Sequence, residues 1–320
     1  MEDKRSRVTR KKRKKVKVIL TIALLLIGIY VTYIAYQAVK AARDSYTELD
    51  RGTTSNLRNE AVKFGKEPVS ILLLGIENYA TGGSGGRADS IIVATFNPNL
   101  ESVKLLSIPR DTRVYIPSKD KEDKINHSYN DGTESTIDTV ENFLSIPIDY
   151  YATVDFDGFK GIIDEIGGIN VEVPFDFWEY SDSENREKIY FTKGMSHLNG
   201  EEALAYVRMR KRDPKGDFGR GDRQKQVIQA SIDSLLSPSN ILKFDNIFSH
   251  VGDNIQTNLK ISDCLSFITN FSSFSSENIT NLSLKGSGTR IKNIYYFIPE
   301  ETSISQVKQE LKDHLNYEGE

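Results

Sequence analysis

Cysteine and histidine are scarce in this chain of 320 residues, and both shortages limit its chemistry. The single cysteine, Cys264, excludes an internal disulfide. The four histidines are scattered without the spacing of metal ligands or of a nucleophilic relay, at His127, His197, His250 and His314. Neither GxSxG nor HExxH occurs, and the glycine-rich loop at 82–86 lacks the lysine of a phosphate-binding P-loop. The motifs of serine hydrolases, zinc peptidases and P-loop proteins are therefore missing.

Charge is absent from one long segment, residues 18–39. The segment has about the ~20 residues that a helix needs to cross a bilayer, and its tyrosines cluster toward the far end, where aromatic rings favour the interface. The seventeen residues before it carry ten Lys and Arg and two acidic residues, a local charge of +8. The positive-inside rule keeps this basic tail, 1–17, in the cytoplasm and places the chain after Lys40 outside. The sequence thus predicts a single-pass cell-membrane protein with a signal-anchor helix at 18–39.

The rest of the chain is acidic, because subtracting the +8 of the tail from the whole-chain charge of −3 leaves −11. A large extracytoplasmic domain without disulfides suits a bacterium better than a eukaryotic secretory route. The polar segment 40–66 is interpreted as a stalk, and 67–320 as the outer domain. About 250 residues are enough for one well-buried domain.

Short apolar runs of strand length alternate with segments of helical spacing in the outer domain. The predicted strands are 69–76, 90–97, 102–108, 150–156 and 169–173, and the predicted helices are 133–144, 159–166 and 305–315. This alternation is typical of the α/β class, so we expect a single domain with a central sheet flanked by helices. No internal repeat is present.

The strongest basic patch of this acidic domain runs from Tyr206 to Gln226, with eight Lys and Arg against three Asp. A helix ending near Tyr206 would let Arg208 and Arg210 face one way from extended chain. A second helix, beginning at Arg220, would gather Arg220, Arg223 and Gln224 at its N-terminus, where an anion is favoured. Arginine's planar fork suits phosphate oxygens. The stretch therefore indicates an oxyanion site, and the alternative is a solvated charged loop.

Two further charged clusters stand beside predicted strands. Glu77 follows the first strand, with Arg87 and Asp89 before the second. The third strand is followed by Arg110, Asp111 and Arg113. Any one Arg–Asp pair could be a structural ion pair, but three clusters at sheet ends favour one shared site. Its arginines would bind a diphosphate, and its carboxylates Glu77 and Asp89 would hold Mg²⁺. This chemistry is metal-dependent phosphoryl transfer. We expect Asp89 to accept the proton of the acceptor hydroxyl, and Arg87 or Arg110 to hold the Asp89 carboxylate in place.

Seven ordered blocks between Phe64 and about Leu236 resemble the LytR-CpsA-Psr family of Gram-positive envelope proteins. The blocks are SILLLGIENY, GGRADSIIVATFNP, LLSIPRDTRVYIP, KINHSYNDG, DYYATVDFDGF, IGGINVEV and LNGEEALAYVRMRKRDPKGDFGRGDRQKQVI. The topology is similar too, with a short cytoplasmic segment, one membrane helix and an outer α/β domain. The resemblance implies a phosphotransferase. It would move an anionic glycopolymer, such as wall teichoic acid, from an undecaprenyl-diphosphate carrier to the C6 hydroxyl of a peptidoglycan sugar.

The same resemblance implies roles for individual residues. The carboxylate matching Asp89 takes part in metal or acid–base work, whereas many members have Asp where this chain has Glu77. The residues that would surround the diphosphate are Arg87, Arg110, Arg113, Arg208, Arg210, Arg220 and Arg223, with Gln224 in the same motif. The expected catalytic residues are Asp89 and Arg110. The expected cofactor is Mg²⁺, with Asp89 and Glu77 as its ligands.

The polyprenyl chain of such a substrate needs an apolar surface. Two predicted helices offer one, through Phe159, Ile162 and Ile163 and through Val227, Ile228 and Leu235. These side chains would line a lipid tunnel or belong to the core.

Two other functions stay open on the sequence alone. A membrane-anchored regulator of envelope gene expression would use the basic tail to contact DNA or a cytoplasmic partner. A non-catalytic module would bind peptidoglycan without releasing a lipid carrier. The transferase is the leading prediction, with the lipid-linked polymer, peptidoglycan and membrane lipid as partners and no nucleic acid.

Overall fold

The structure is a computed structural model that describes residues 46–77, 86–237, 240, 254–260, 263, 271 and 274–319. The predicted membrane helix at 18–39, the basic tail, most of the glycine-rich loop and Cys264 lie outside the described residues. Among the helices that are described, none is both long enough and apolar enough to cross a bilayer.

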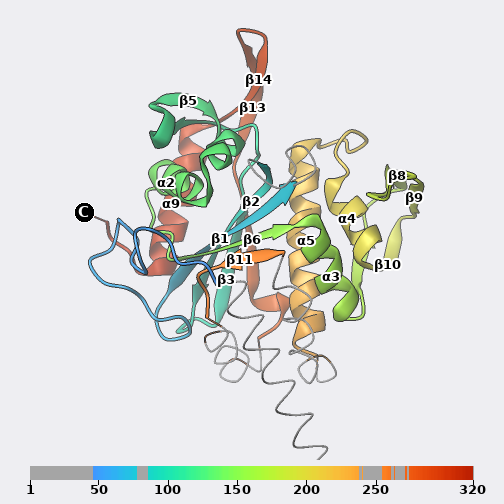
Figure 1. Ribbon diagram of the computed structural model, residues 1–320, viewed down its shortest axis with the longest axis horizontal. Helices are drawn as coiled ribbons and strands as arrows, with labels where there is room; N and C mark the ends of the chain where they lie inside the picture. The colour runs from blue at the N-terminus through green and yellow to red at the C-terminus, as the bar shows by residue number, and fades with distance from the viewer. Residues whose placement is uncertain are drawn as a thin grey trace, which may run out of the picture.

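A six-stranded mixed sheet forms the centre of the domain (Figure 1). Its strands are β1 (Val69–Glu77), β2 (Arg87–Asn97), β3 (Ser102–Ser107), β6 (Tyr150–Asp155), β11 (Ile255–Thr257) and β12 (Ile279–Ser283). Their order is β11-β6-β1-β2-β3-β12. The pairs β1–β2, β2–β3 and β6–β11 are antiparallel, and β1–β6 and β3–β12 are parallel.

Alternating side chains give the sheet two buried faces. On β1, Leu72 and Leu74 are buried in a cluster with α2 (Thr133–Leu144) and α9 (Glu301–Leu315). Leu73, between them, packs into a different cluster with Ile228 and other residues of α5 (Asp217–Leu235). Successive residues of a strand point to opposite faces, so helices cover both sides of the sheet. The predicted α/β class with a central sheet flanked by helices is confirmed, and the sheet is mixed.

A second group of elements packs beside α5 around its own apolar cluster. It contains α3 (Phe156–Glu165) and α4 (Gly200–Arg208). Two antiparallel pairs complete it, β7 (Ile169–Val173) with β10 (Gly194–Leu198) and β8 (Phe177–Tyr180) with β9 (Lys188–Phe191). The Asn199 side chain accepts from the Glu202 amide and Glu202 accepts from the Asn199 amide, a capping box that fixes where α4 begins.

The remaining elements are short strands, 3₁₀ helices and a hairpin outside the central sheet. They are β4 (Arg113–Ile116), β5 (Lys121–Lys124), the 3₁₀ helices η1 (Pro117–Lys119), η2 (Ile125–Asp131) and η3 (Ser276–Asn278), and the hairpin of β13 (Gly286–Ile291) and β14 (Ile294–Pro299). The hairpin projects from the body of the domain (Figure 1). Its base meets the segment that follows β3, because the Phe297 amide donates to the Asp111 carbonyl at 2.9 Å.

The described part of the predicted stalk, 46–66, packs against the domain. Arg58 Nε donates to Asp149 Oδ1 at 2.6 Å, and Arg51 Nη1 donates to Glu141 Oε1 at 3.0 Å. Both carboxylates are buried, and a buried carboxylate needs a cationic partner. These two arginines of the predicted stalk therefore neutralise buried charges of the domain itself.

His314 fixes α9 on the sheet and makes folding depend on pH. Its ring nitrogens lie 2.7 Å from Thr95 Oγ1 and 2.9 Å from Ser102 Oγ. Burial, with a smaller contribution from Lys104, lowers the pKa of His314 to about 4, so the folded chain keeps this ring neutral at pH values where the unfolded chain protonates it. We expect the contribution of His314 to the free energy of unfolding to be fully present above about pH 6.5. The free energy of unfolding should then fall by about 3 kcal/mol as the pH decreases toward 4.

Urea denaturation at pH 7.5 and pH 4.5, on the wild type and on His314→Asn, tests this expectation. The wild type should lose about 2–3 kcal/mol more than the variant between the two pH values. An equal loss in both proteins would mean that another group controls the pH dependence.

Candidate active site

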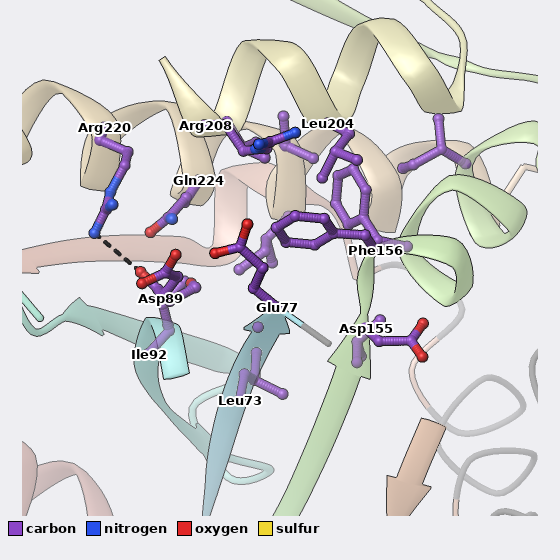
Figure 2. Close-up of a pocket in the computed structure, with 18 of the residues that line it drawn as sticks. Leu73, Glu77, Asp89, Ile92, Asp155, Phe156, Leu204, Arg208, Arg220 and Gln224 are labelled. Carbon is purple, nitrogen blue, oxygen red and sulfur yellow. Dashed lines mark hydrogen bonds between the residues drawn. The ribbon is translucent and has the colours of Figure 1, made fainter. Parts of the chain in front are cut away.

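One cavity of about 590 Å³ opens between the sheet and the helices α3, α4 and α5. Its lining combines charged side chains with apolar ones. In Figure 2, Glu77, Asp89, Arg220 and Gln224 face one part of the cavity, and Phe156 and Leu204 face another. Such a lining suits an amphipathic ligand, with an anionic group at one end and an apolar group at the other.

A β-bulge aims Asp89 at this cavity. The register of β1 and β2 pairs Gly75 with Ser90 and Ile76 with Ala88, which leaves Asp89 as the extra residue. The strands approach closely here, because a Cβ on Gly75 would lie 2.9 Å from the Cβ of Ser90. A bulge bends the strand and releases backbone groups from the ladder, so the Asp89 carbonyl is free to accept another donor.

Arg110 and Arg220 hold Asp89 from two sides. Arg110 Nη1 donates to Asp89 Oδ1 at 2.5 Å, and Arg220 Nη2 donates to the Asp89 carbonyl at 2.9 Å. Burial lowers the pKa of the Arg110 guanidinium, but the charge and hydrogen bond of Asp89 outweigh it, so this pKa is raised. Burial also lowers the pKa of Arg220, and here it outweighs the attraction of Asp217, 3.1 Å away.

Both guanidiniums keep donors unused. The Nε atoms of Arg110 and Arg220 are buried and have no hydrogen-bond partner within the described chain. A buried donor without an acceptor is costly, and a bound anion is one way to relieve that cost. The cavity is therefore prepared for an oxyanion beside Asp89.

Arg208 and Arg210 reach the cavity from the end of α4. The helix runs to Arg208, two residues past its predicted end, and Met209 then turns the chain to extended geometry with ψ 126°. Arg208 Nη1 donates to Asp182 Oδ1 at 3.0 Å, and its guanidinium lies 4.9 Å from the centre of the Phe156 ring. Arg210 lies 3.7 Å from Asp111 and 3.8 Å from Asp217, distances that leave it available to a stronger acceptor.

The helix that carries Arg220 begins earlier than predicted, at Asp217. The prediction that Arg220, Arg223 and Gln224 lie together holds for only two of them. Arg220 and Gln224 line the cavity, as residues four apart on a helix share a face. Arg223 instead points about 100° away from Gln224 around the helix, into the protein. There its Nε donates to the Tyr206 carbonyl at 2.9 Å, and its other nitrogens bond the Asp213 carboxylate and the Met209 carbonyl.

Comparison with known proteins agrees with this geometry. The model of the LytR_cpsA_psr family matches residues 32–313. The chain belongs to the LytR-CpsA-Psr family. It is 52% identical over 284 residues to the polyisoprenyl-teichoic acid–peptidoglycan teichoic acid transferase TagV of Bacillus subtilis (strain 168), covering 87% of this chain and 73% of that protein.

Solved structures of the family are similar. The crystal structure of Bacillus subtilis TagV matches with a TM-score of 0.71 and 52% identity, over 79% of this chain and 98% of that one. A structure of TagT bound to LI-WTA also matches with a TM-score of 0.71, at 32% identity, over 84% of this chain and 99% of that one. The mixed sheet and its flanking helices are thus the fold of LytR-CpsA-Psr proteins.

The residues that the family resemblance singled out divide into two groups in space. The cavity brings together Glu77, Asp89, Arg110, Arg208, Arg210, Arg220 and Gln224. The other three do not line it. Arg113 pairs with Glu122 on the β4–β5 hairpin, Arg223 is the buried residue described above, and Arg87 is exposed at the start of β2, opposite Glu77 in register.

We expect Arg223→Ala to act on stability. The Arg223 and Asp213 side chains are each 3% exposed, and removing one partner of a buried ion pair costs about 3–5 kcal/mol. Arg113→Ala is a matched control, because Arg113 and Glu122 are 35% and 50% exposed and such pairs contribute at most about 1 kcal/mol. Urea denaturation of both variants measures the difference. A stable Arg223→Ala protein that no longer binds a polyprenyl diphosphate would return Arg223 to the predicted diphosphate site.

Glu77 and Asp89 are the cavity carboxylates that could share a metal ion. Asp89 Oδ1 is bonded by Arg110, whereas the Glu77 carboxylate has no hydrogen-bond or ion-pair partner in the part of the chain that the structure describes. Both side chains line the cavity and lie near one another in Figure 2. The described residues contain no group of three or more potential metal-ligating side chains. Two carboxylates alone suit Mg²⁺, which takes its remaining ligands from phosphate and water.

The apolar residues considered for a lipid tunnel all line the cavity, Phe159, Ile162 and Ile163 from α3 and Val227, Ile228 and Leu235 from α5. Ile163 and Val227 are also buried in the apolar cluster around α3 and α4, so the wall of the cavity is itself core. The residues thus line a cavity and belong to the core at once, and a lipid in that cavity stays a prediction.

Several lining residues escaped the sequence analysis. Phe156, Leu204 and Val207 follow the spacing of the two helices next to residues already considered, so helical periodicity could have found them. The lining also includes Glu179, Tyr180, Arg186, Lys211 and Arg212. The first three of these lie on and after β8, a strand that was not predicted from the sequence.

Proposed function

We propose that this chain is a phosphotransferase that moves an anionic glycopolymer of the teichoic acid type from a polyisoprenyl diphosphate to peptidoglycan. The observation that carries the proposal is the single cavity in which unsatisfied arginine donors meet an apolar wall. The name of the Bacillus subtilis relative at 52% identity supports the same reaction. The carrier in a Gram-positive envelope would be undecaprenyl diphosphate, whose tail would lie between α3 and α5.

The arginines would bind the diphosphate. Arg110 and Arg220 are the most buried of them and would contact it beside Asp89, where exclusion of water strengthens each charge-assisted hydrogen bond. Arg208 and Arg210, from the end of α4, and Gln224, on the same face of α5 as Arg220, would complete the set. Arg87, exposed next to Glu77, would contact the diphosphate from the edge of the cavity. Arginines fixed before the substrate arrives stabilise the charge that develops as the bond breaks.

The reaction needs one proton acceptor. A hydroxyl of the peptidoglycan sugar, at C6 by family resemblance, would attack the phosphorus nearer the polymer. A new P–O bond forms, the bond to the lipid-side phosphate breaks, and the lipid leaves as its monophosphate. Asp89 would take the hydroxyl proton, because Arg110 fixes one carboxylate oxygen and leaves the other toward the cavity. Holding both reactants in one orientation supplies much of the remaining rate.

Glu77 and Asp89 would hold Mg²⁺ together with phosphate oxygens. Bound there, the ion would neutralise charge on the diphosphate and its leaving group.

The membrane anchor is part of the proposal. The uncharged segment 18–39 and the basic tail before it support a single membrane helix with the amino terminus in the cytoplasm and the catalytic domain outside. This topology would hold the cavity where both the lipid carrier and peptidoglycan are found.

The experiment that tests the function uses the full chain in detergent micelles with Mg²⁺, a lipid-linked polymer precursor and a peptidoglycan oligomer. The proposal predicts a covalent conjugate of polymer and oligomer together with released lipid. Binding of the oligomer without release of lipid would favour the glycan-binding module instead. Loss of function only on deletion of residues 4–15, with the membrane topology intact, would favour the regulator.

A further inference from the structure

A cluster of cations lies at the rim of the cavity, outside the set that surrounds Asp89. This rim cluster consists of Arg186, Lys211 and Arg212, which line the cavity with Glu179 as their acidic neighbour. Lys211 and Arg186 are exposed residues and the Arg212 side chain is 30% exposed, whereas the Arg220 side chain beside Asp89 is 8% exposed. The cluster therefore borders the open side of the cavity.

Aromatic side chains hold this cluster in place. The Arg212 guanidinium lies 3.4 Å from the centre of a Trp178 ring, and Lys188 Nζ lies 4.2 Å from it. The Arg186 guanidinium lies 5.3 Å from the centre of the Tyr180 ring, which packs edge-on against Trp178 at 5.0 Å. Cations stacked on aromatic faces keep their charge and lose flexibility before any ligand binds.

The rim cluster is joined to the diphosphate end of the cavity. Lys211 and Arg212 follow Arg210 directly in the chain, and Asp182, between Tyr180 and Arg186, accepts from Arg208 at 3.0 Å. The apolar wall of α3 and α5 is assigned to the lipid tail, so the next charged part of the donor beyond the diphosphate is its polymer. Glu179 offsets one of three positive charges, since Arg212 Nη1 donates to it at 3.4 Å. A net positive rim remains.

We propose that Arg186, Lys211 and Arg212 form a second anion subsite, which binds phosphodiester groups of the polymer that follows the diphosphate. This inference rests on the proposed function and names which part of the donor the enzyme distinguishes. A donor whose polymer carries phosphodiesters would contact the rim, and a donor that ends in neutral sugars would not. The subsite thus favours extended, polyanionic donors over short ones.

The test compares two donors with the full chain in detergent micelles. The short donor is a disaccharide on polyprenyl diphosphate, and the extended donor adds several polyol-phosphate units. The triple variant Arg186→Gln, Lys211→Gln, Arg212→Gln should lower the ratio of kcat/KM for the extended donor to that for the short donor by about tenfold, as loss of partly exposed charge-assisted contacts would. The preference of the wild type should also weaken as salt increases.

Two further variants keep the result interpretable. Lys215→Gln is a matched control, because Lys215 lies in the same loop, is 72% exposed and does not line the cavity, so the ratio should stay at its wild-type value. Lys211→Gln alone disturbs no aromatic stack in the described structure and should lower the ratio by about twofold to threefold.

Four outcomes would overturn the subsite. An unchanged ratio in the triple variant would do so, and so would an equal loss on both donors, which would assign the cluster to the diphosphate or to folding. A raised KM for the peptidoglycan oligomer alone would assign it to the acceptor. A loss that appears only in vesicles with anionic lipid, on both donors, would assign it to lipid headgroups. If the wild type forms no conjugate from either donor, the proposed function itself fails. If the wild type forms conjugate but the ratio stays unchanged in the triple variant, only the subsite fails.

Discussion

Asp89→Asn should retain binding of the lipid diphosphate and lose turnover by on the order of a hundredfold or more, the usual effect of removing a general base. The amide keeps the size of the side chain and can still accept a hydrogen bond from Arg110 at the position of Oδ1. It cannot take the proton of the acceptor hydroxyl. Steady-state kinetics with the extended donor would measure kcat, and a fluorescent polyprenyl diphosphate would measure binding.

Asp222→Asn is the matched control for this substitution. Asp222 is 53% exposed, pairs with Lys215 and Lys225, and does not line the cavity, so its amide variant should keep wild-type turnover. An unstable Asp89→Asn protein that binds no lipid would make Asp89 a structural partner of the arginines. Asp111, which lies 2.7 Å from Lys124 and 3.7 Å from Arg210, would then be the next carboxylate to test.

Arg110→Ala should lower kcat/KM by about a hundredfold to a thousandfold, the usual loss when one preorganised donor to a developing negative charge is removed. The substitution removes a buried donor that we propose binds the diphosphate, and also the group that fixes Asp89. Arg110→Lys should recover only part of the activity, because an ammonium group cannot bond Asp89 and a phosphate with the planar fork of arginine. Circular dichroism and thermal unfolding would establish that both variants fold.

Arg208→Ala extends this test to the part of the cavity formed by the end of α4. Its side chain is 34% exposed and pairs with Asp182, so its loss should reduce turnover with little change in stability. Full activity in both Arg110→Ala and Arg208→Ala would remove the diphosphate site from this cavity.

Sequence patterns were sufficient where structure depends on local spacing. The apolar positions Ile137, Val140 and Leu144 predict a helix at 133–144, and α2 has those bounds. The clustering of Glu77, Asp89 and Arg110 was also predictable, because all three stand at the ends of neighbouring strands. Each of these inferences needs only the period of a helix or the alternation of a strand.

Other features depend on contacts between distant segments, which no local pattern reveals. The bulge at Asp89 is set by the register of β2 against β1. Arg223 lies three residues after Arg220, a spacing that predicts a shared helix face. Its guanidinium instead points into the protein, where it donates to the carbonyls of Tyr206 and Met209 at the end of α4. The segment 46–66 is polar, and only the buried carboxylates of Glu141 and Asp149 explain why it is docked.

The most direct test of the account follows the phosphorus atoms of the donor through one turnover. The donor is prepared with a radioactive label in the phosphate next to the polymer and is mixed with the full chain, Mg²⁺ and a peptidoglycan oligomer. Phosphoryl transfer predicts that the label enters the conjugate and that the lipid is released as an unlabelled monophosphate. Release of the lipid as a labelled diphosphate would show that a sugar–oxygen bond breaks instead, and would contradict the assignment of this cavity to phosphotransfer.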